Sequence, residues 1–155
     1  MILISDNIVI IEPFADGHRL QYVRRIVSEL RIRNKSVDLM ICRGAMQHPA
    51  YIQLMAACPD NLNVIQLDDN LFSNAHWSGI KEPLYTIIRH FCYYRSFKKI
   101  HKQIINKFEC IFVPYLDYCD KMIGLFGSPF SDDAWAGLLM RPSFHYQEMG
   151  VLAPP

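Results

Sequence analysis

The segment 7–19 constrains the fold most strongly, because one short turn joins an apolar run to a helical pattern. The run begins at Ile8 and stops at Pro13, which has no backbone N–H to donate to a neighbouring strand. Gly17 permits a tight turn before the helical pattern. A buried strand, a glycine turn and a helix are typical of parallel α/β proteins, which bind ligands at the carboxyl ends of their strands. The turn has neither the glycine spacing of a dinucleotide site nor the Gly-Lys-Ser/Thr of a phosphate-binding loop.

The rest of the chain repeats this alternation. Further strands are predicted at 36–42, 63–67, 110–114 and 136–140, and helices at 18–33, 49–58 and 82–108, with a last helix capped by Asp117 and ending near Phe126. In the first helix an apolar stripe runs from Leu20 to Leu30, and Arg19 falls outside it. Because the connections are too long for hairpins, we predict one α/β domain over residues 1–155, with a parallel sheet and helices on both faces.

Composition is that of an ordinary globular α/β protein. Of the 155 residues 51% are hydrophobic and 20% charged, and the formal net charge is +1. The five cysteines form no C-x-x-C motif, and four lie in apolar segments, which favours buried, reduced thiols in the cytoplasm over disulfides or a zinc site. No segment has the pattern of a signal peptide or the length of a membrane span. No metal, cofactor or nucleic-acid partner is expected.

Asp16, Gly17 and His18 form the best candidate binding site, because they follow the first predicted strand. His18 stands at the start of a helix, where the helix dipole favours a neutral imidazole that serves as a base or a hydrogen-bond partner. The alternative is that Gly17 only shapes the turn and that His18 is a solvated residue of the first helical turn.

Three other polar segments follow predicted strands. Asp117 should face the same edge of the sheet as Gly17, although a plain helix N-cap is the commoner role for such a residue. In the loop after the third strand, His76 precedes Trp77, whose ring suits stacking on a sugar and equally suits anchoring a loop. Arg141, after the last predicted strand, is suited to holding a phosphate.

The long helix 82–108 is strongly basic. With Lys81 just before it, the segment carries seven Lys and Arg residues against one acid, Glu82. Such a helix can lie on an anionic membrane surface, which makes a peripheral membrane contact one interpretation. Its aromatic-rich apolar stripe fits the protein core equally well, and the basic residues would then form a solvated face.

The sequence resembles the N-terminal half of a GT-B glycosyltransferase of the retaining, family-four-like kind. The resemblance rests on IVIIEPFADGHRLQYVRRIVSEL at residues 8–30, on IFVPYLDYCDKM at residues 111–122, and on the order of elements between them. WAGLLMRPSFHY at residues 135–146 is similar to bacterial members. Family members have two Rossmann-like halves, which bind the acceptor and the nucleotide-sugar donor respectively. The resemblance implies a Rossmann-like, acceptor-side domain whose turn at Gly17 and His18 faces the cleft, and an acceptor that is a sugar or lipid-linked.

The donor-binding half of that family, with its paired glutamates, is missing from this sequence. We therefore expect an acceptor-binding domain that does not transfer sugar alone, and we assign no catalytic residue. The competing interpretation is a stand-alone doubly wound domain that binds a small ligand or a partner protein without catalysis. A downstream reading frame that encodes a second α/β half would favour the enzyme.

Overall fold

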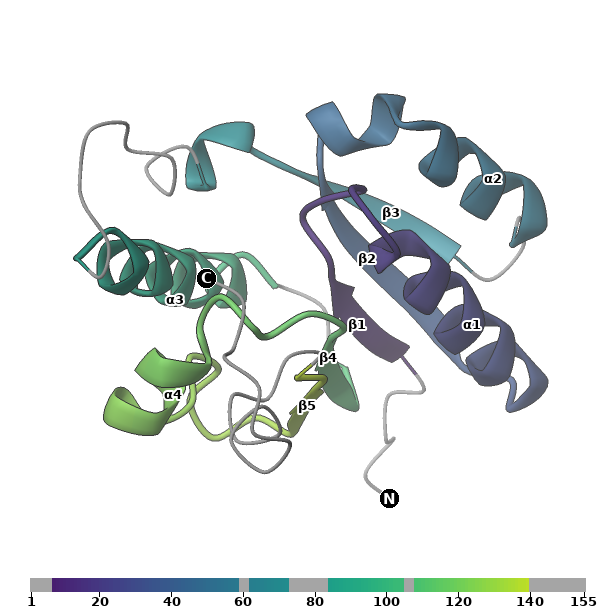
Figure 1. Ribbon diagram of the computed structural model, residues 1–155. Helices are drawn as coiled ribbons and strands as arrows, with labels where there is room; N and C mark the ends of the chain where they lie inside the picture. Colours follow the sequence, from purple (N-terminus) through teal and green to yellow (C-terminus); the bar gives the residue numbers. More distant parts are fainter. Residues whose placement is uncertain (1–6, 59–61, 73–83, 105–107, 140–155) are drawn as a thin grey trace, which may run out of the picture.

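The computed structural model describes residues 7–58, 62–72, 84–104 and 108–139, which form a five-stranded parallel sheet flanked by helices (Figure 1). The strands are β1 (Asn7–Ile11), β2 (Ser36–Cys42), β3 (Leu62–Leu67), β4 (Cys110–Val113) and β5 (Trp135–Gly137). The α-helices are α1 (Arg19–Ile32), α2 (Pro49–Ala57), α3 (Leu84–His101) and α4 (Asp120–Phe126). Two short 3-10 helices, η1 (Gly44–Gln47) and η2 (Asp69–Leu71), follow β2 and β3. The predicted parallel α/β fold is confirmed.

The strand order β3-β2-β1-β4-β5 places a topological switch point between β1 and β4. The chain runs outward from β1 to β2 and β3, then returns through α3 and enters the sheet beside β1 as β4. Ile10 of β1 pairs with Leu39 of β2 on one side and with Phe112 of β4 on the other. Rossmann-like sheets have this order, and their ligands bind beyond the carboxyl ends of the strands at the switch point.

Helices cover both faces of the sheet, as predicted, and the central strand β1 shows why. Alternate side chains of a strand point to opposite faces. Ile8 and Ile10 pack in one apolar cluster with residues of α1 and α2, while Val9 and Ile11 pack in a second cluster with residues of α3 and α4. Figure 1 shows α1 and α2 on one side of the sheet and α3 and α4 on the other. A strand that is apolar on both faces is thereby buried on both faces.

Helix α3 is shorter than predicted. It ends at His101, not near Phe108. After it the chain makes tight turns, in which the Gln103 N–H donates to the Ile100 carbonyl at 2.8 Å and the Ile104 N–H donates to the His101 carbonyl at 3.2 Å. These bonds reach back three residues instead of four, so they close the helix before the chain enters β4.

The apolar stripe of α3 is only partly a core face. Phe97 and Ile100 are buried against the sheet. Nearer the start of the helix, Leu84, Ile87 and Phe91 are exposed, with 55%, 51% and 42% of their surface accessible. The interpretation in which the stripe packs in the core therefore holds for the second half of α3 and not for these three residues of the first half.

The predicted capping role of Asp117 is also wrong. Helix α4 starts at Asp120, its N-cap is Cys119, and no side chain caps it. The Leu116 carbonyl accepts from the N–H groups of Cys119 at 2.9 Å and Asp120 at 3.1 Å. This extra turn separates β4 from α4 and leaves Asp117 in the loop between them.

The five cysteines are free thiols, as predicted. Cys42, Cys58 and Cys119 are buried, and Cys92 and Cys110 are half-buried, so three rather than four belong to the interior. Burial raises the pKa of the Cys42 and Cys119 thiols to about 12, which keeps them neutral and unreactive. None of the helices in the described residues has the length and apolar character that crossing a membrane requires.

Candidate functional site

The loops after β1 and β4 meet at the carboxyl edge of the sheet, where the switch point lies. Gly17 has a φ of +63°, a left-handed conformation that favours glycine, and a Cβ there would meet no atom within 4 Å. The turn places His18 at the N-cap of α1. The two loops line a hollow of about 310 Å³, which we call the switch-point hollow; its walls are Asp16, Gly17, His18, Arg19, Tyr22, Tyr115 and Tyr118.

His18 presents an exposed imidazole to the switch-point hollow. Its Nδ1 lies 3.1 Å from Oε1 of Gln21, one turn further along α1. An amide oxygen only accepts hydrogen bonds, so Nδ1 carries the hydrogen and the Nε2 of a neutral imidazole is left as an acceptor. His18 can therefore receive a hydrogen bond from a ligand hydroxyl.

Arg19 forms the buried inner wall of the hollow, with 7% of its surface accessible. Its Nη1 donates to Oε1 of Glu12 at 3.1 Å, and its Nε lies 3.5 Å from Oδ2 of Asp16. The guanidinium carbon lies 4.1 Å from the centre of the Tyr115 ring, a cation–π contact. Burial alone would lower the pKa of Arg19. The acidic groups of Glu12 and Asp16 have the opposite and larger combined effect, so the pKa of Arg19 is raised. Arg19 thus ties the β1 loop to the β4 loop.

Glu12 is buried behind Arg19, with 1% of its surface accessible. Its Oε1 accepts from Arg19 and, at 3.4 Å, from the backbone N–H of Phe14. Its Oε2 is buried and has no hydrogen-bond partner among the described residues. Burial therefore outweighs the attraction to Arg19 and raises the pKa of Glu12 to about 7, so this carboxyl changes charge near neutral pH.

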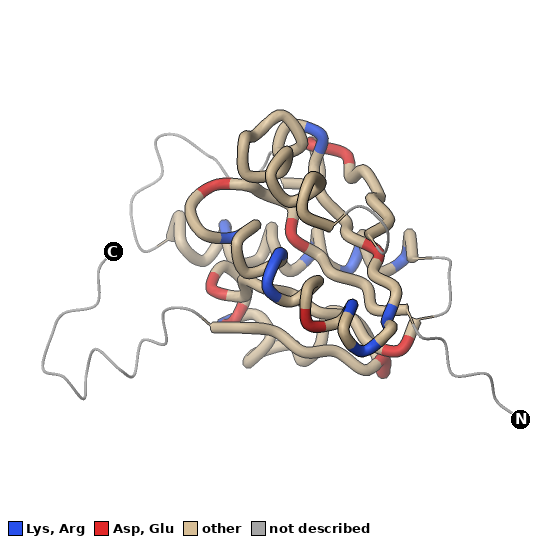
Figure 2. Tube along the Cα trace, turned by 90° about the vertical axis from the view of Figure 1, so that its right-hand side faces the viewer, with Lys and Arg blue, Asp and Glu red and all other residues tan. Residues whose placement is uncertain are grey.

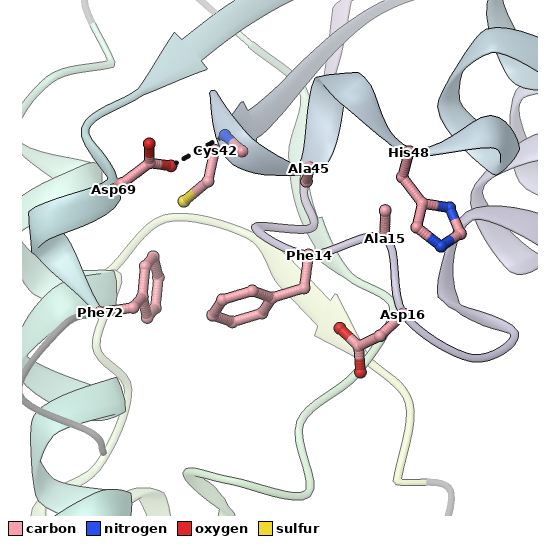
Figure 3. A pocket seen from close by; sticks show the side chains of 9 residues that line it. Phe14, Ala15, Asp16, Cys42, Ala45, His48, Asp69 and Phe72 are labelled. Carbon is pink, nitrogen blue, oxygen red and sulfur yellow. Dashed lines mark hydrogen bonds between the residues drawn. The ribbon is translucent and has the colours of Figure 1, made fainter. Parts of the chain in front are cut away.

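A second hollow, of about 340 Å³, lies between the loops after β1, β2 and β3 (Figure 3). We call it the apolar hollow; its walls are Phe14, Ala15, Asp16, Cys42, Gly44, Ala45, His48, Asp69 and Phe72. The Phe14 and Phe72 rings meet edge to face, with centroids 5.2 Å apart. Oδ1 of Asp69 accepts from the Gly44 N–H at 3.1 Å, which joins the loops after β2 and β3. Asp16 lines both hollows, so they adjoin at this residue.

The structure brings together three of the predicted site residues. Asp16, Gly17 and His18 line the switch-point hollow. Asp117 lies in the loop after β4, as predicted, but the residues of that loop in the wall of the hollow are its two tyrosines. The other predicted residues, His76, Trp77 and Arg141, lie outside the described residues.

Arg19, Glu12 and the aromatic walls were not predicted as site residues. The placement of Arg19 with the polar residues of the first helix is wrong, because the side chain is buried. A signal was available: Glu12 ends an apolar strand, and an acid there needs a buried partner, which Arg19 supplies seven residues later. Within the described residues, no group of three or more His, Cys, Asp and Glu side chains is arranged to hold a metal ion.

No known family profile and no curated protein matches this sequence. Several solved structures resemble this chain in part, among them two proteins solved in complex with a UDP-sugar. Arabidopsis thaliana UGT89C1 complexed with UDP-L-rhamnose is 13% identical, with a TM-score of 0.46 over 77% of this chain and 33% of that one. Phytolacca americana UGT2 complexed with UDP-2fluoro-glucose and pterostilbene is 15% identical, with a TM-score of 0.49 over 97% of this chain and 35% of that one. The chain thus spans about a third of the length of each. These likenesses concern the path of the backbone and assign no function.

The stability of the fold should depend on Glu12 between pH 4.5 and 7. In this window the unfolded carboxyl is ionised and the folded one keeps its proton, so the folded chain binds more protons. The free energy of unfolding therefore falls as the pH rises, by up to ~1.4 kcal/mol per pH unit. Glu12→Gln removes this dependence, so the variant should gain stability relative to the natural chain as the pH rises from about 5 to about 8.

Urea unfolding at the two pH values measures this effect, with Glu29→Gln on the exposed side of α1 as the control for loss of a surface carboxylate. The quantity compared is the difference in the free energy of unfolding between each variant and the natural chain, because the contribution of all other titrating groups then cancels. If the difference in the free energy of unfolding between Glu12→Gln and the natural chain were the same at both pH values, the claim that the buried Glu12 carboxyl is protonated would be wrong.

Proposed function

We propose that these residues form the acceptor-binding domain of a glycosyltransferase that uses a nucleotide-sugar donor, with the donor held by a second domain. One observation supports the proposal above others. The two segments that carry the GT-B resemblance, residues 8–30 and 111–122, are far apart in the sequence, yet both supply walls of the switch-point hollow. They meet where a Rossmann-like sheet binds its ligands.

The switch-point hollow suits an acceptor hydroxyl. Glycosyl transfer to a hydroxyl requires a group that accepts its proton and contacts that point its oxygen at the donor. His18 offers the Nε2 acceptor, and Asp16, on the same rim, offers a carboxylate. Tyr115 and Tyr118 also line this hollow, and because Arg19 and Arg89 lie over their rings, their ring edges and hydroxyl groups would contact the acceptor. His18 is the residue that we propose contacts the reacting hydroxyl.

The residues of this chain would supply only one wall of the catalytic cleft. In a two-domain enzyme, holding both reactants across the cleft provides much of the rate. The switch-point hollow would orient the acceptor, but the diphosphate and base of the donor would be held by the other half. This chain alone should therefore bind acceptors without transferring sugar.

The alternative function is a stand-alone doubly wound domain that binds a small ligand or a partner protein. The same hollows would serve it, because nothing in their walls requires a donor. The reading frame that follows this chain separates the two proposals: a second α/β half favours the transferase, and an unrelated segment or a stop favours the binding domain.

We also propose that α3 lies against the cytoplasmic surface of an anionic membrane. The exposed residues Leu84, Ile87 and Phe91 are followed at the same helical spacing by exposed Arg95 and Lys98, and exposed Lys102 comes directly after the end of α3. Side chains three or four residues apart share a helix face, so the apolar and basic residues form one exposed stripe. An apolar segment inserts between lipid headgroups while basic residues attract anionic ones. Such a contact would suit a lipid-linked acceptor.

The membrane proposal is tested with vesicles. The chain should sediment with vesicles that contain phosphatidylserine and stay in solution with pure phosphatidylcholine vesicles. Charge reversal of Lys98 to Glu should weaken sedimentation, because each basic residue near such a surface contributes roughly 1 kcal/mol. Lys121→Glu, the same change on the exposed part of α4, is the matched control. Equal effects of the two substitutions, or no sedimentation with either vesicle, would contradict the contact.

The acceptor proposal is tested by calorimetry with the purified chain, a panel of hydroxylated sugars and lipid-linked sugars, and a panel of nucleotide-sugars. We expect binding of acceptors, no binding of nucleotide-sugars and no turnover. His18→Gln should weaken acceptor binding by roughly 1 kcal/mol, the value of one hydrogen bond. His101→Gln is the control, since His101 ends α3 far from this edge and contacts Asp133. Turnover above background, or acceptor binding indifferent to His18, would refute the proposal.

A further inference from the structure

We propose that the open edge of the sheet at β3 pairs with the same edge of a second copy of this chain, so that two five-stranded sheets join into one. β3 is the outermost strand on one side of the sheet, with β2 as its neighbour (Figure 1). The contact would run along the length of β3, whereas the two hollows lie at the carboxyl ends of the strands. The pairing therefore does not depend on the proposed function.

The edge strand β3 has none of the features that usually protect an edge. An edge strand presents N–H and C=O groups that no neighbouring strand satisfies, and natural sheets blunt such edges with charged residues, proline or a very short strand. The strand at the opposite edge, β5, has only three residues. β3 has six, LNVIQL, without a charge or a proline, and it extends over about 20 Å. The turn, loop and cap hydrogen bonds of the described residues include none to β3.

The helix beside this edge is uncharged as well. Leu54 of α2 packs in one apolar cluster with Leu62 of β3. Residues 44–58 and 62–67 contain no Lys, Arg, Asp or Glu, although 20% of the whole chain is charged, and both segments are tan throughout in Figure 2. On α2, Ile52 exposes 62% of its surface. A scarcity of charge is the compositional mark of the centre of a protein interface.

The absence of charge favours a second copy over partners of other kinds. Nucleic acids and anionic lipids are bound through Lys and Arg, which these segments lack. A charged peptide would find no group of opposite sign here. A second copy brings an equally uncharged edge, and the unpaired N–H and C=O groups of one β3 can bond to those of the other. The edge is thus complementary to itself, which is what a symmetric dimer contact requires.

The symmetry fixes the direction of the pairing. A two-fold axis perpendicular to the sheet makes the two β3 strands antiparallel and continues each face of one sheet into the same face of the other. Sheets that are otherwise parallel commonly have an antiparallel pair at the edge. Because β3 has no charged residue, no register of this pairing sets like charges opposite each other within the two strands.

Sedimentation equilibrium of the purified chain, with a reductant that keeps its cysteines as free thiols, should show monomers in equilibrium with dimers. Gln66 is exposed on β3. Gln66→Glu places a carboxylate in each edge, and pairing would remove water from it without supplying a cation. The dissociation constant of the dimer should rise at least tenfold. Gln103→Glu, the same change at an exposed residue beyond the end of α3, is the matched control and should leave it unchanged.

Amide hydrogen exchange locates the contact within the chain. Between a dilute and a concentrated sample, the amides of β3 should exchange more slowly in the concentrated one, while those of β5 at the opposite edge should exchange equally in both. Circular dichroism confirms that each variant is folded. A chain that stays monomeric at every concentration would overturn the proposal. Equal weakening by Gln66→Glu and Gln103→Glu, or a dimer whose β3 amides are not slowed, would overturn it as well.

Discussion

A buried positive charge at the start of α1 is the constraint on which the candidate site depends. The guanidinium of Arg19 stays ionised in proteins, so its removal from water must be offset by carboxylates and ring faces. Glu12 comes from the end of β1, Asp16 from the glycine turn and Tyr115 from the β4 loop. The loops that line the switch-point hollow are therefore held by the environment that Arg19 requires.

Asp16 stands between two hollows of different polarity. On one side of Asp16 lies a hollow with an imidazole acceptor and tyrosine walls, and on the other lies a hollow walled mainly by apolar side chains. Figure 2 shows basic and acidic positions interspersed along the described chain, in keeping with a net charge of +1. Recognition at this edge would therefore depend on contacts inside the hollows and not on attraction by a large field of one sign.

The centre of the sheet could be predicted because β1 and β2 are buried on both faces, and because Pro13 and Gly44 follow them as turn residues. The turn at Gly17 could be predicted because a backbone conformation is a local property. The burial of Arg19 could not, because its partners come from another element and a helical period alone places it outside the core stripe. The misplaced cap at Asp117 has a similar origin: the extra turn after β4 is set by backbone hydrogen bonds to Leu116, which leave no mark in the residue pattern. The apolar hollow joins three loops through tertiary contacts, so its walls became visible only in the structure.

The most direct test of the role of Arg19 is a double-mutant cycle with Tyr115. Urea unfolding would be measured for the natural chain, Arg19→Met, Tyr115→Leu and the double variant. The loss of a partner for Glu12 is common to both Arg19→Met chains and cancels, so the cycle isolates the coupling between the β1 and β4 loops. We predict a coupling free energy of roughly 1–2 kcal/mol, as expected for a desolvated cation–π contact. Additive effects of the two substitutions would contradict the conclusion that Arg19 holds the loops together.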